Sequence, residues 1–318
     1  MEAPHPPLTA GPLLECVPNL SEGRRPEALA DLAATLAARR DVRLLDLSSD
    51  PDHHRTVVTL AGAAEPLRGA VLALAGWAER WIDLRQHRGV HPRLGALDVV
   101  PFVPLAGATM ADAVAAAHAT AAALAERFAL PVFLYEAAAA RPERRRLADV
   151  RRGQFEGLAA RLADPAEAPD YGPATPHSRL GATVVGARDF LIAVNARLAT
   201  ADTAVARDIA RTIRESAGGL PGVRALGLYL ESRGCAQVSM NLVDHRRTSL
   251  LALLARVEAE AARRGTAVAA TELVGLVPSA ALFGPLAAAL RCPELDGGRL
   301  VEWRLLEEEL RAARAAAG

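Results

Sequence analysis

The residues best suited to chemistry lie in a loop at 86–95, which reads QHRGVHPRLG. Histidine is the side chain whose ordinary pKa falls between pH 5 and 8, so His87 and His91 are candidates for proton transfer. Pro92 restricts His91 to extended geometry, and the two glycines of the loop permit tight turns. Loops held by rigid elements often carry catalytic groups. The pattern predicts an imidazole directed into a cleft, with a surface loop carrying incidental histidines as the alternative.

A second polar loop, at 48–55, follows an apolar segment and reads SSDPDHHR. Imidazole and carboxylate groups suit zinc or iron, so Asp50, Asp52, His53 and His54 are candidate metal ligands. A solvated turn is the simpler interpretation, because adjacent histidines seldom bind one ion together. We therefore expect no metal at this loop.

A third stretch, at 172–181, combines glycines, prolines and hydroxyl groups with His177 and Arg179. It lies in a proline-rich segment at 164–180, which indicates a linker or an ordered crossing segment. Clefts between domains are favoured ligand sites, and Arg179 could bind a carboxylate through two parallel hydrogen bonds. A ligand-binding segment and a plain linker are both compatible with these residues.

Composition excludes several classes of enzyme. The 318-residue chain has 37 basic and 37 acidic side chains and contains no lysine, so every basic residue is an arginine. Schiff-base enzymes, lysine-based pyridoxal-phosphate enzymes and Walker A nucleotide-binding loops all need a lysine. The net charge of zero argues against nucleic acid as a partner. The arginines at 144–146 and 151–152 are interpreted as a solvated helix face.

Targeting and redox signals point to the cytoplasm. The N-terminal residues lack the basic and apolar regions of a signal peptide, and no apolar stretch reaches the length of a membrane span. The three cysteines are far apart and form no CxxC pair, so neither a zinc site nor a disulfide framework is expected. We therefore expect a cytoplasmic protein with no membrane partner.

Length and periodicity predict two α/β halves. Short apolar runs bounded by Pro, Gly or Asp alternate with alanine-rich segments of helical period. The order strand–helix–strand–strand–helix–strand occurs in both halves, which favours two split βαβ units packed as α/β sandwiches. We expect domains at 1–175 and 176–295, followed by an amphipathic helix at 296–318. No glycine-rich fingerprint supports a Rossmann fold.

Eight motifs stand in a recognisable order along the chain. They are ECVPNLSEG (15–23), DPDHHRTV (50–57), HRGVHPRLGALD (87–98), RGQFE (152–156), PDYGP (169–173), GATVVGAR (181–188), CAQVSMN (235–241) and ELVGLVP (272–278). Together they resemble the glutamate formimidoyltransferase (formiminotransferase) family. The resemblance extends from about residue 13 to about residue 290.

The resemblance implies a fold, a reaction and partners. Members have two α/β subdomains of similar, ferredoxin-like βαββαβ topology with a substrate tunnel between them, and they form homodimers. They transfer a formimidoyl group between N-formimidoyl-L-glutamate and N5 of tetrahydrofolate, which is a co-substrate, in histidine degradation and one-carbon metabolism. Vertebrate members are fused to a cyclodeaminase, whereas this chain ends about 40 residues after its last motif. A stand-alone transferase with a separate cyclodeaminase as partner is therefore expected, with no metal.

The resemblance also assigns site residues. By motif, the catalytic histidine of the family falls on His91, the histidine that precedes Pro-Arg. The folate-binding segment falls on ten consecutive residues, which are Gly172, Pro173, Ala174, Thr175, Pro176, His177, Ser178, Arg179, Leu180 and Gly181.

Other roles and one departure concern the residues around His91. A carboxylate, from Asp50 or Asp52, is expected to orient the histidine. Because lysine is absent, Arg55, Arg93 and Arg179 are candidates for binding the carboxylates of glutamate and folate. The departure is His54, which stands where relatives often have asparagine.

Two other functions remain open at this point. One is a metal-dependent amidohydrolase that acts on formimidoylglutamate through His53, His54 and His87; activity without folate, lost on chelation, would identify it. The other is a non-catalytic folate-binding protein. The intact His91-Pro-Arg motif argues against the second alternative.

Overall fold

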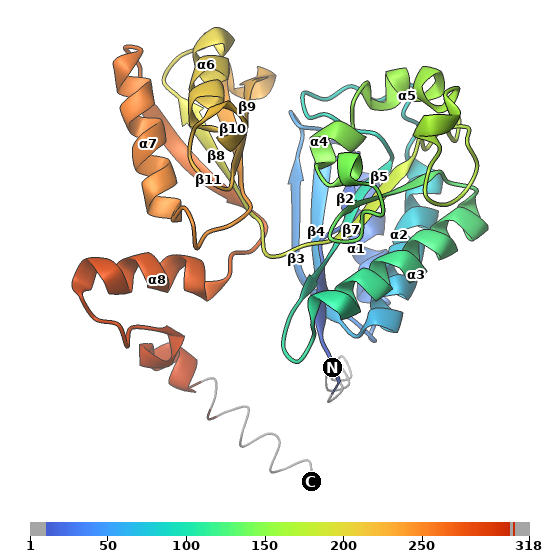
Figure 1. Cartoon of the computed structure of the whole chain (residues 1–318), viewed down its shortest axis with the longest axis horizontal. Coiled ribbons are helices and arrows are strands. Elements are labelled where there is room, and N and C mark those ends of the chain that lie inside the picture. Colours follow the sequence, from blue (N-terminus) through green and yellow to red (C-terminus); the bar gives the residue numbers. More distant parts are fainter. Residues whose placement is uncertain (1–10, 306–307, 309–318) are drawn as a thin grey trace. The chain divides into compact units, whose positions relative to one another are not determined.

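The computed structural model describes residues 11–305 and 308, and the chain divides into two compact units (Figure 1). The first consists of Met1–Asp189 with Leu230–Gly234, and the second of Phe190–Tyr229 with Cys235–Gly318. The boundary expected after residue 175 falls inside the first unit. The reason is that the strand β7 (Thr183–Ala187) pairs with two other strands of that unit.

A seven-stranded sheet forms the framework of the first unit. Its strands are β1 (Leu14–Cys16), β2 (Asn19–Leu20), β3 (Arg43–Asp50), β4 (Arg55–Gly62), β5 (Leu97–Pro104), β6 (Val132–Glu136) and β7. β1 and β2 both lie between β4 and β5 and are antiparallel to them, and β3 pairs with β4. β7 extends the sheet in parallel from β5, and β6 pairs in parallel with β7.

The first four strand positions, in the order β3, β4, β1/β2 and β5, form the split βαβ arrangement that the sequence predicts. The connections are the helices α1 (Pro26–Ala37) and α2 (Ala64–Trp81). β1 and β2 are separated at Pro18, whose nitrogen has no hydrogen to donate to the ladder. Pairing continues through the break, because Val17 N donates to Pro101 O and Val58 N donates to Pro18 O.

Apolar side chains fill both faces of this sheet, because successive residues of a strand point to opposite sides. In β6, Val132 and Leu134 belong to the larger core, which α1, α2 and α3 (Met110–Phe128) complete. Phe133 and Tyr135 belong to a smaller core on the other face. The short helices α4 (Leu147–Val150) and α5 (Gln154–Leu162) pack on that smaller core. The sheet is thus a layer between two sets of helices.

The second unit repeats the same order of elements. They are β8 (Ile192–Leu198), α6 (Thr203–Ile213), β9 (Val223–Leu230), β10 (Cys235–Leu242), α7 (Leu250–Arg263) and β11 (Val268–Val274). Their strands form a sheet in the order β11, β8, β10, β9, with Val194, Ile209 and Leu253 in its core. The two ferredoxin-like α/β subdomains predicted from the sequence are confirmed.

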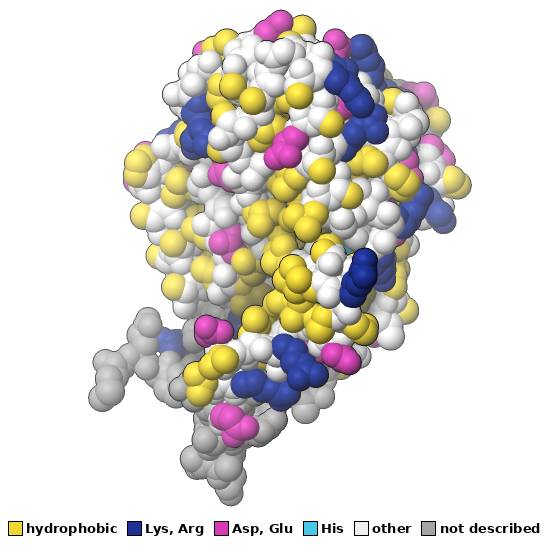
Figure 2. Space-filling model, turned by 90° about the vertical axis from the view of Figure 1, so that its left-hand side faces the viewer, with side chains coloured by type: hydrophobic (Ala, Val, Ile, Leu, Met, Phe, Trp, Pro, Cys, Tyr) yellow, Lys and Arg dark blue, Asp and Glu magenta, His cyan; other side chains and the backbone are white. Residues whose placement is uncertain are grey.

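The helix α8 (Ser279–Leu290) is apolar around its whole circumference yet contributes only Ala281 to the buried core. Leu282 and Leu286 in α8 and Leu273 in β11 are exposed. Figure 2, which looks onto the side of Figure 1 that carries α7 and α8, shows apolar side chains gathered across the surface. Single exposed apolar residues are common on protein surfaces, whereas a contiguous group of them is not. The surface at α8 and β11 therefore differs from an ordinary protein exterior.

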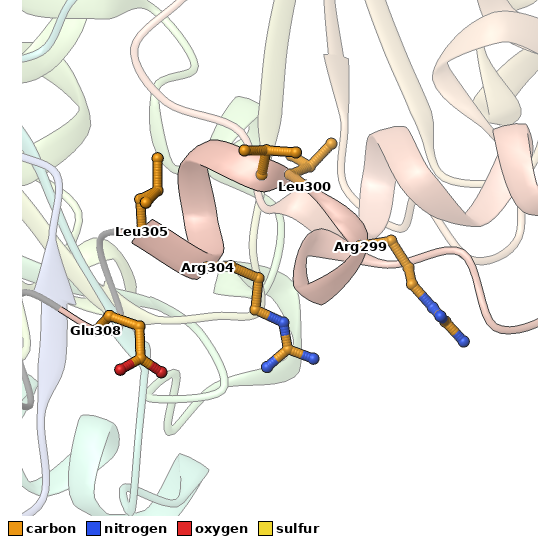
Figure 3. A pocket seen from close by; sticks show the side chains of 6 residues that line it. Arg299, Leu300, Arg304, Leu305 and Glu308 are labelled. Atoms are coloured by element: carbon orange, nitrogen blue, oxygen red, sulfur yellow. The ribbon is translucent and has the colours of Figure 1, made fainter.

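The helix expected at 296–318 lies partly within the described residues. A 3-10 turn at Gly297–Arg299 leads into helical residues at 301–305. Leu300 and Leu305 lie on one side of this short helix and Arg304 on the other, and with Arg299 and Glu308 they line a shallow hollow (Figure 3). Residues 306–307 and 309–318 lie outside the described residues.

Short 3-10 turns complete the regular elements. Besides the turn before the last helix, they lie at Pro142–Arg144, Pro165–Glu167, Glu215–Ala217 and Glu231–Arg233. Across residues 11–305 and 308, no helix is both long enough and apolar enough to cross a bilayer.

Candidate active site

His91 lies in the irregular loop that connects α2 to β5, and its side chain is half-buried. Its Nδ1 lies 2.8 Å from the carbonyl oxygen of Pro92, which can only accept a hydrogen bond. The neutral ring therefore carries its hydrogen on Nδ1 and keeps the lone pair of Nε2 for another group. Nε2 has no hydrogen-bond partner among the described residues. The arrangement presents an unprotonated imidazole nitrogen, as a general base requires.

Asp98 is the buried acid that anchors this loop. Asn19 and Leu20 of β2 pair with Val99 and Leu97 of β5, so Asp98 is the extra residue of a β-bulge. Its Oδ1 accepts hydrogen bonds from the backbone nitrogens of Leu94 at 2.7 Å and of Gly95 at 3.3 Å. The bulge therefore turns a carboxylate toward the end of the loop that carries His91.

Two arginines share the other oxygen of Asp98. Arg55, the first residue of β4, donates from Nη1 to Oδ2 at 2.7 Å, and Arg151, just after α4, donates from Nη2 to the same oxygen. Burial alone would raise the pKa of Asp98, but the Arg151 and Arg55 guanidinium groups outweigh it and hold that pKa well below its usual range. Burial lowers the pKa of Arg55 to about 10, although Asp98 opposes the shift. Asp98 and Arg55 are therefore both charged near neutral pH.

These charges act on His91. Burial lowers the pKa of His91 well below its ordinary value, and the positive charges of Arg55 and Arg151 lower it further, while Asp98 partly opposes them. The ring of His53 stacks near that of His91, with 5.9 Å between centroids and 29° between planes. His91 is therefore neutral at physiological pH and able to accept a proton.

The other histidine of the loop, His87, is fully engaged by the protein. Its Nδ1 accepts a hydrogen bond from Nε of Arg93 at 3.1 Å, so its Nε2 carries the hydrogen and donates to His54 O at 3.0 Å. Burial lowers the pKa of His87 to about 4. Arg93 in turn donates to both carboxylate oxygens of Glu156, at 2.6 and 2.8 Å. These contacts make His87 and Arg93 a structural support.

His54 lies against His87, with 4.1 Å between ring centroids and 6° between planes. Its Nδ1 lies 2.9 Å from Arg88 O and its Nε2 lies 3.3 Å from Oε1 of Glu22. Both neighbouring oxygens can accept a hydrogen bond from the ring. Its φ of 51° lies in the left-handed region that asparagine and histidine tolerate better than most residues. The backbone therefore explains why an amide or an imidazole suits this position.

The loops at 48–55 and 86–95 interlock closely. Val90 N donates to Asp52 O at 3.2 Å. A Cβ atom on Gly89 would lie 2.6 Å from His53 O, so only glycine fits where the two backbones cross. The loop that carries His91 is thus held on one side by the histidine loop and on the other by Asp98.

Neither acid expected to orient His91 bonds it. Asp50 Oδ1 accepts a hydrogen bond from His53 N at 2.7 Å. The carboxylate of Asp52 accepts from the backbone and hydroxyl of Ser232, a residue of the first unit, at 3.0 and 2.5 Å. The carbonyl of Pro92 takes the orienting role instead, and sequence spacing gives no sign of it.

The histidines proposed for the metal alternative do not converge as ligands. His87 has committed both ring nitrogens to protein groups, one as an acceptor and one as a donor. Within the part of the chain that the structure describes, no group of three or more His, Cys, Asp and Glu side chains is placed to hold a metal ion. The observed contacts of these residues are those of a hydrogen-bonded turn.

The expected folate segment, 172–181, runs along the surface and ends beside the loop of His91. Its first residues, Gly172 to Thr175, are exposed. His177 and Gly181 exchange two backbone hydrogen bonds, and Nδ1 of His177 accepts from the backbone of Arg179 and Leu180. Ala96 N donates to Leu180 O at 2.9 Å, next to the backbone that Asp98 holds.

The candidate arginines differ in whether their hydrogen-bond donors are already used by the protein. Arg55 lies beside His91, whereas the donors of Arg93 are used by Glu156 and His87. Arg179 is partly exposed, with its Nε 3.8 Å from Asp83. The structure adds Arg151, for which the sequence predicts a place on a solvated helix face. The expected solvated face is wrong for Arg144 as well, which is buried and pairs with Asp170 at 2.8 Å. Arginine runs usually are solvated, and only contacts with distant acids distinguish these two.

Comparisons with known proteins identify the family to which the chain belongs. Residues 13–188 match the formiminotransferase domain, N-terminal subdomain, and residues 193–289 match the formiminotransferase domain. The chain is 41% identical over 284 residues to a glutamate formimidoyltransferase of Streptococcus pyogenes, covering 89% of this chain and 95% of that protein. It is 38% identical over 295 residues to a glutamate formimidoyltransferase of Thermoplasma acidophilum, covering 92% and 97%.

A third relative is longer. The formimidoyltransferase-cyclodeaminase of Rattus norvegicus is 40% identical over 305 residues, which cover 94% of this chain and 55% of that protein. Both units match the family, and the two prokaryotic relatives match over nearly their whole lengths. The chain belongs to the formiminotransferase family.

Proposed function

We propose that the chain transfers the formimidoyl group between N-formimidoyl-L-glutamate and N5 of tetrahydrofolate, with His91 as general acid and base. The observation that supports it best is the state of His91, a neutral ring with Nδ1 bound to Pro92 O and Nε2 without a described partner. The relatives named glutamate formimidoyltransferase supply the reaction. No observation favours the amidohydrolase or the non-catalytic alternative.

The chemistry follows from the need to move one proton. N5 of tetrahydrofolate attacks the formimidoyl carbon and forms a tetrahedral intermediate, and Nε2 of His91 takes the proton that N5 loses. The same ring then returns the proton to the glutamate nitrogen as the carbon–nitrogen bond breaks. Proton transfer by a positioned side chain typically contributes about 10²–10⁴-fold to the rate. The hydrogen bond to Pro92 O keeps the ring in the tautomer that this sequence needs.

Tetrahydrofolate is proposed to bind as co-substrate along residues 172–181. Two features support this placement: the exposure of Gly172 to Thr175, and the backbone contact between Leu180 and Ala96 close to the catalytic loop. The segment is also ordered by its own turn between His177 and Gly181. Folate bound there would lie against backbone that Asp98 fixes.

The partners follow from the family. We propose a homodimer, which sedimentation equilibrium of the pure protein would establish. We also propose that a separate cyclodeaminase consumes the product, since the Rattus norvegicus relative joins both names in one chain and the two prokaryotic relatives do not.

The decisive assay combines pure protein, tetrahydrofolate and formimidoylglutamate and follows 5-formimidoyltetrahydrofolate. We expect product only when both substrates are present. Parallel reactions replace the donor with formimidoylglycine or omit folate. Glutamate released without folate, and lost on chelation, would identify a hydrolase and overturn the transferase. Folate binding without turnover of either donor would identify a binding protein.

A further inference from the structure

The cluster of Arg55, Asp98 and Arg151 carries more positive than negative charge. Both guanidinium groups donate to the same oxygen of the fully buried Asp98. Both arginine side chains are themselves about nine-tenths buried, with exposed fractions of 10% and 11%. One positive charge is therefore left without a counter-charge in this cluster, beside the ring of His91.

Arg151 has unused donors. Its Nη2 bonds Asp98, and no other nitrogen of its guanidinium has a partner among the described residues. Its Nε is buried, and a buried donor without an acceptor is unfavourable, more so when it is charged. Arg152, the next residue, differs completely, because its side chain is exposed and paired with Glu167. Of these two neighbours, the one with an unsatisfied buried donor is the one that bonds Asp98.

The covalent structure of formimidoylglutamate shows which of its carboxylates could reach Arg151. In formimidoylglutamate, the α-carboxylate is attached to the carbon that carries the reacting nitrogen. The γ-carboxylate is farther away, and the glutamate tail of folate is separated from N5 by the pterin and benzoate rings. Arg151 bonds the same carboxylate that holds the loop of His91, so this cationic group is placed for the α-carboxylate.

We propose that Arg151, supported by Arg55 and Asp98, binds the α-carboxylate of the formimidoyl amino acid donor. This inference rests on the proposed transferase function and adds a residue that determines donor specificity. Guanidinium and carboxylate form charge-assisted hydrogen bonds that are shorter and stronger than neutral ones. Asp98 is a positioning residue, since it holds Arg151 and the loop of His91 together.

Donor binding would then influence catalysis as well as affinity. The positive charges of Arg55 and Arg151 lower the pKa of His91 in the protein without substrate. A bound carboxylate neutralises the excess charge, which makes protonation of the ring easier when N5 attacks. The donor thus prepares the base that the reaction needs.

The test measures amino acid binding without turnover. L-Glutamate is titrated into protein saturated with tetrahydrofolate, a pair that contains no formimidoyl group. γ-Aminobutyrate lacks the α-carboxylate, and L-2-aminobutyrate lacks the γ-carboxylate. We expect the wild-type protein to bind glutamate about 10–100-fold more tightly than γ-aminobutyrate, the range of one charge-assisted hydrogen bond. R151Q should abolish that preference and keep the preference over L-2-aminobutyrate.

Two further variants separate binding from folding. R151K retains the charge and should restore part of the preference, whereas R152Q, the matched control, should bind like wild type. Weaker binding of glutamate and γ-aminobutyrate by the same factor in R151Q would make Arg151 merely structural and overturn the proposal. Absence of glutamate binding to wild-type protein would overturn it as well. Selective binding without formation of 5-formimidoyltetrahydrofolate would instead refute the proposed reaction and leave the carboxylate site standing.

Discussion

Two pairs of stacked histidines lie in the same two loops of the first unit, and they are built differently. In the pair His54 and His87, every ring nitrogen contacts a protein group, and the rings lie 4.1 Å apart and nearly parallel. In the pair His53 and His91, the rings are 5.9 Å apart, and Nε2 of His91 has no hydrogen-bond partner among the described residues. Saturation of both ring nitrogens with hydrogen bonds distinguishes His87 from His91, the proposed proton carrier.

The difference shows how one kind of side chain serves two purposes within a few residues. Burial lowers the pKa of both His87 and His91, so both rings are neutral. A neutral ring with both nitrogens bonded fixes a loop. A neutral ring with one free lone pair accepts a proton, and its neighbours set how readily it does so.

Replacing His91 tests the comparison most strongly. His91→Ala removes the proposed proton carrier and should lower kcat about 10²–10⁴-fold while folate binding persists. The measurement is steady-state formation of 5-formimidoyltetrahydrofolate together with folate binding by fluorescence. His245→Gln, in a loop of the second unit, is the control and should keep wild-type turnover. Near-normal turnover of the alanine variant would remove His91 from its catalytic role.

Replacing the supporting histidine should change stability rather than chemistry. The pKa of His87 is about 4 in the folded protein and ordinarily about 6.5. Between these two pH values the ring binds a proton in the unfolded chain but not in the folded protein. Stability therefore falls as the pH falls through this window, by about 2 kcal/mol between pH 7 and pH 5 for this one group. Asparagine at 87 keeps an acceptor for Arg93 but cannot titrate. Between pH 7 and pH 5, the free energy of unfolding of His87→Asn should therefore fall by about 2 kcal/mol less than that of the wild-type protein.

Urea unfolding at pH 9, 8, 7, 6 and 5 measures this difference. From about pH 8 upward the ring is neutral in both states, so the two proteins should show the same pH slope there. An equally steep acid loss in His87→Asn would mean that other groups cause it, and the contrast between the two pairs would weaken.

The smallest effect on stability is expected at Glu156, the exposed end of the contacts that support His87. Glu156 binds Arg93 through both oxygens, but its side chain is 60% exposed. Exposed ion pairs contribute about 0.2–1 kcal/mol, so Glu156→Gln should lower the free energy of unfolding by less than about 1 kcal/mol. Thermal unfolding at low and high salt checks this value. A loss of several kcal/mol would show that Glu156 is essential for holding His87 through Arg93.

The sequence predicted the order of the strands and helices because apolar periodicity and turn residues are local signals. It also indicated His91, since Pro92 and the neighbouring glycines mark a constrained loop. Gly153, with a φ of 79° that glycine adopts without strain, separates α4 from α5. These features depend on neighbours within a few residues.

The rest of the site depends on contacts between distant segments. The bulge at Asp98 arises from the pairing of β2 with β5, and no pattern within β5 announces it. Arg151 stands in an arginine run that resembles an ordinary solvated helix. Arg93 looked available for a substrate, but Glu156 and His87 use its donors. Spacing alone does not show which arginine meets which acid.

The carboxylate of Asp98 joins residues 43 and 53 positions away in the chain, so the site has a consequence for folding. Contacts at such separations require the closure of long loops and form slowly compared with helices. A refolding intermediate with its helices already formed would still lack the arrangement around His91. Recovery of enzymatic activity would therefore report the last steps of assembly of the first unit, and circular dichroism would report earlier ones.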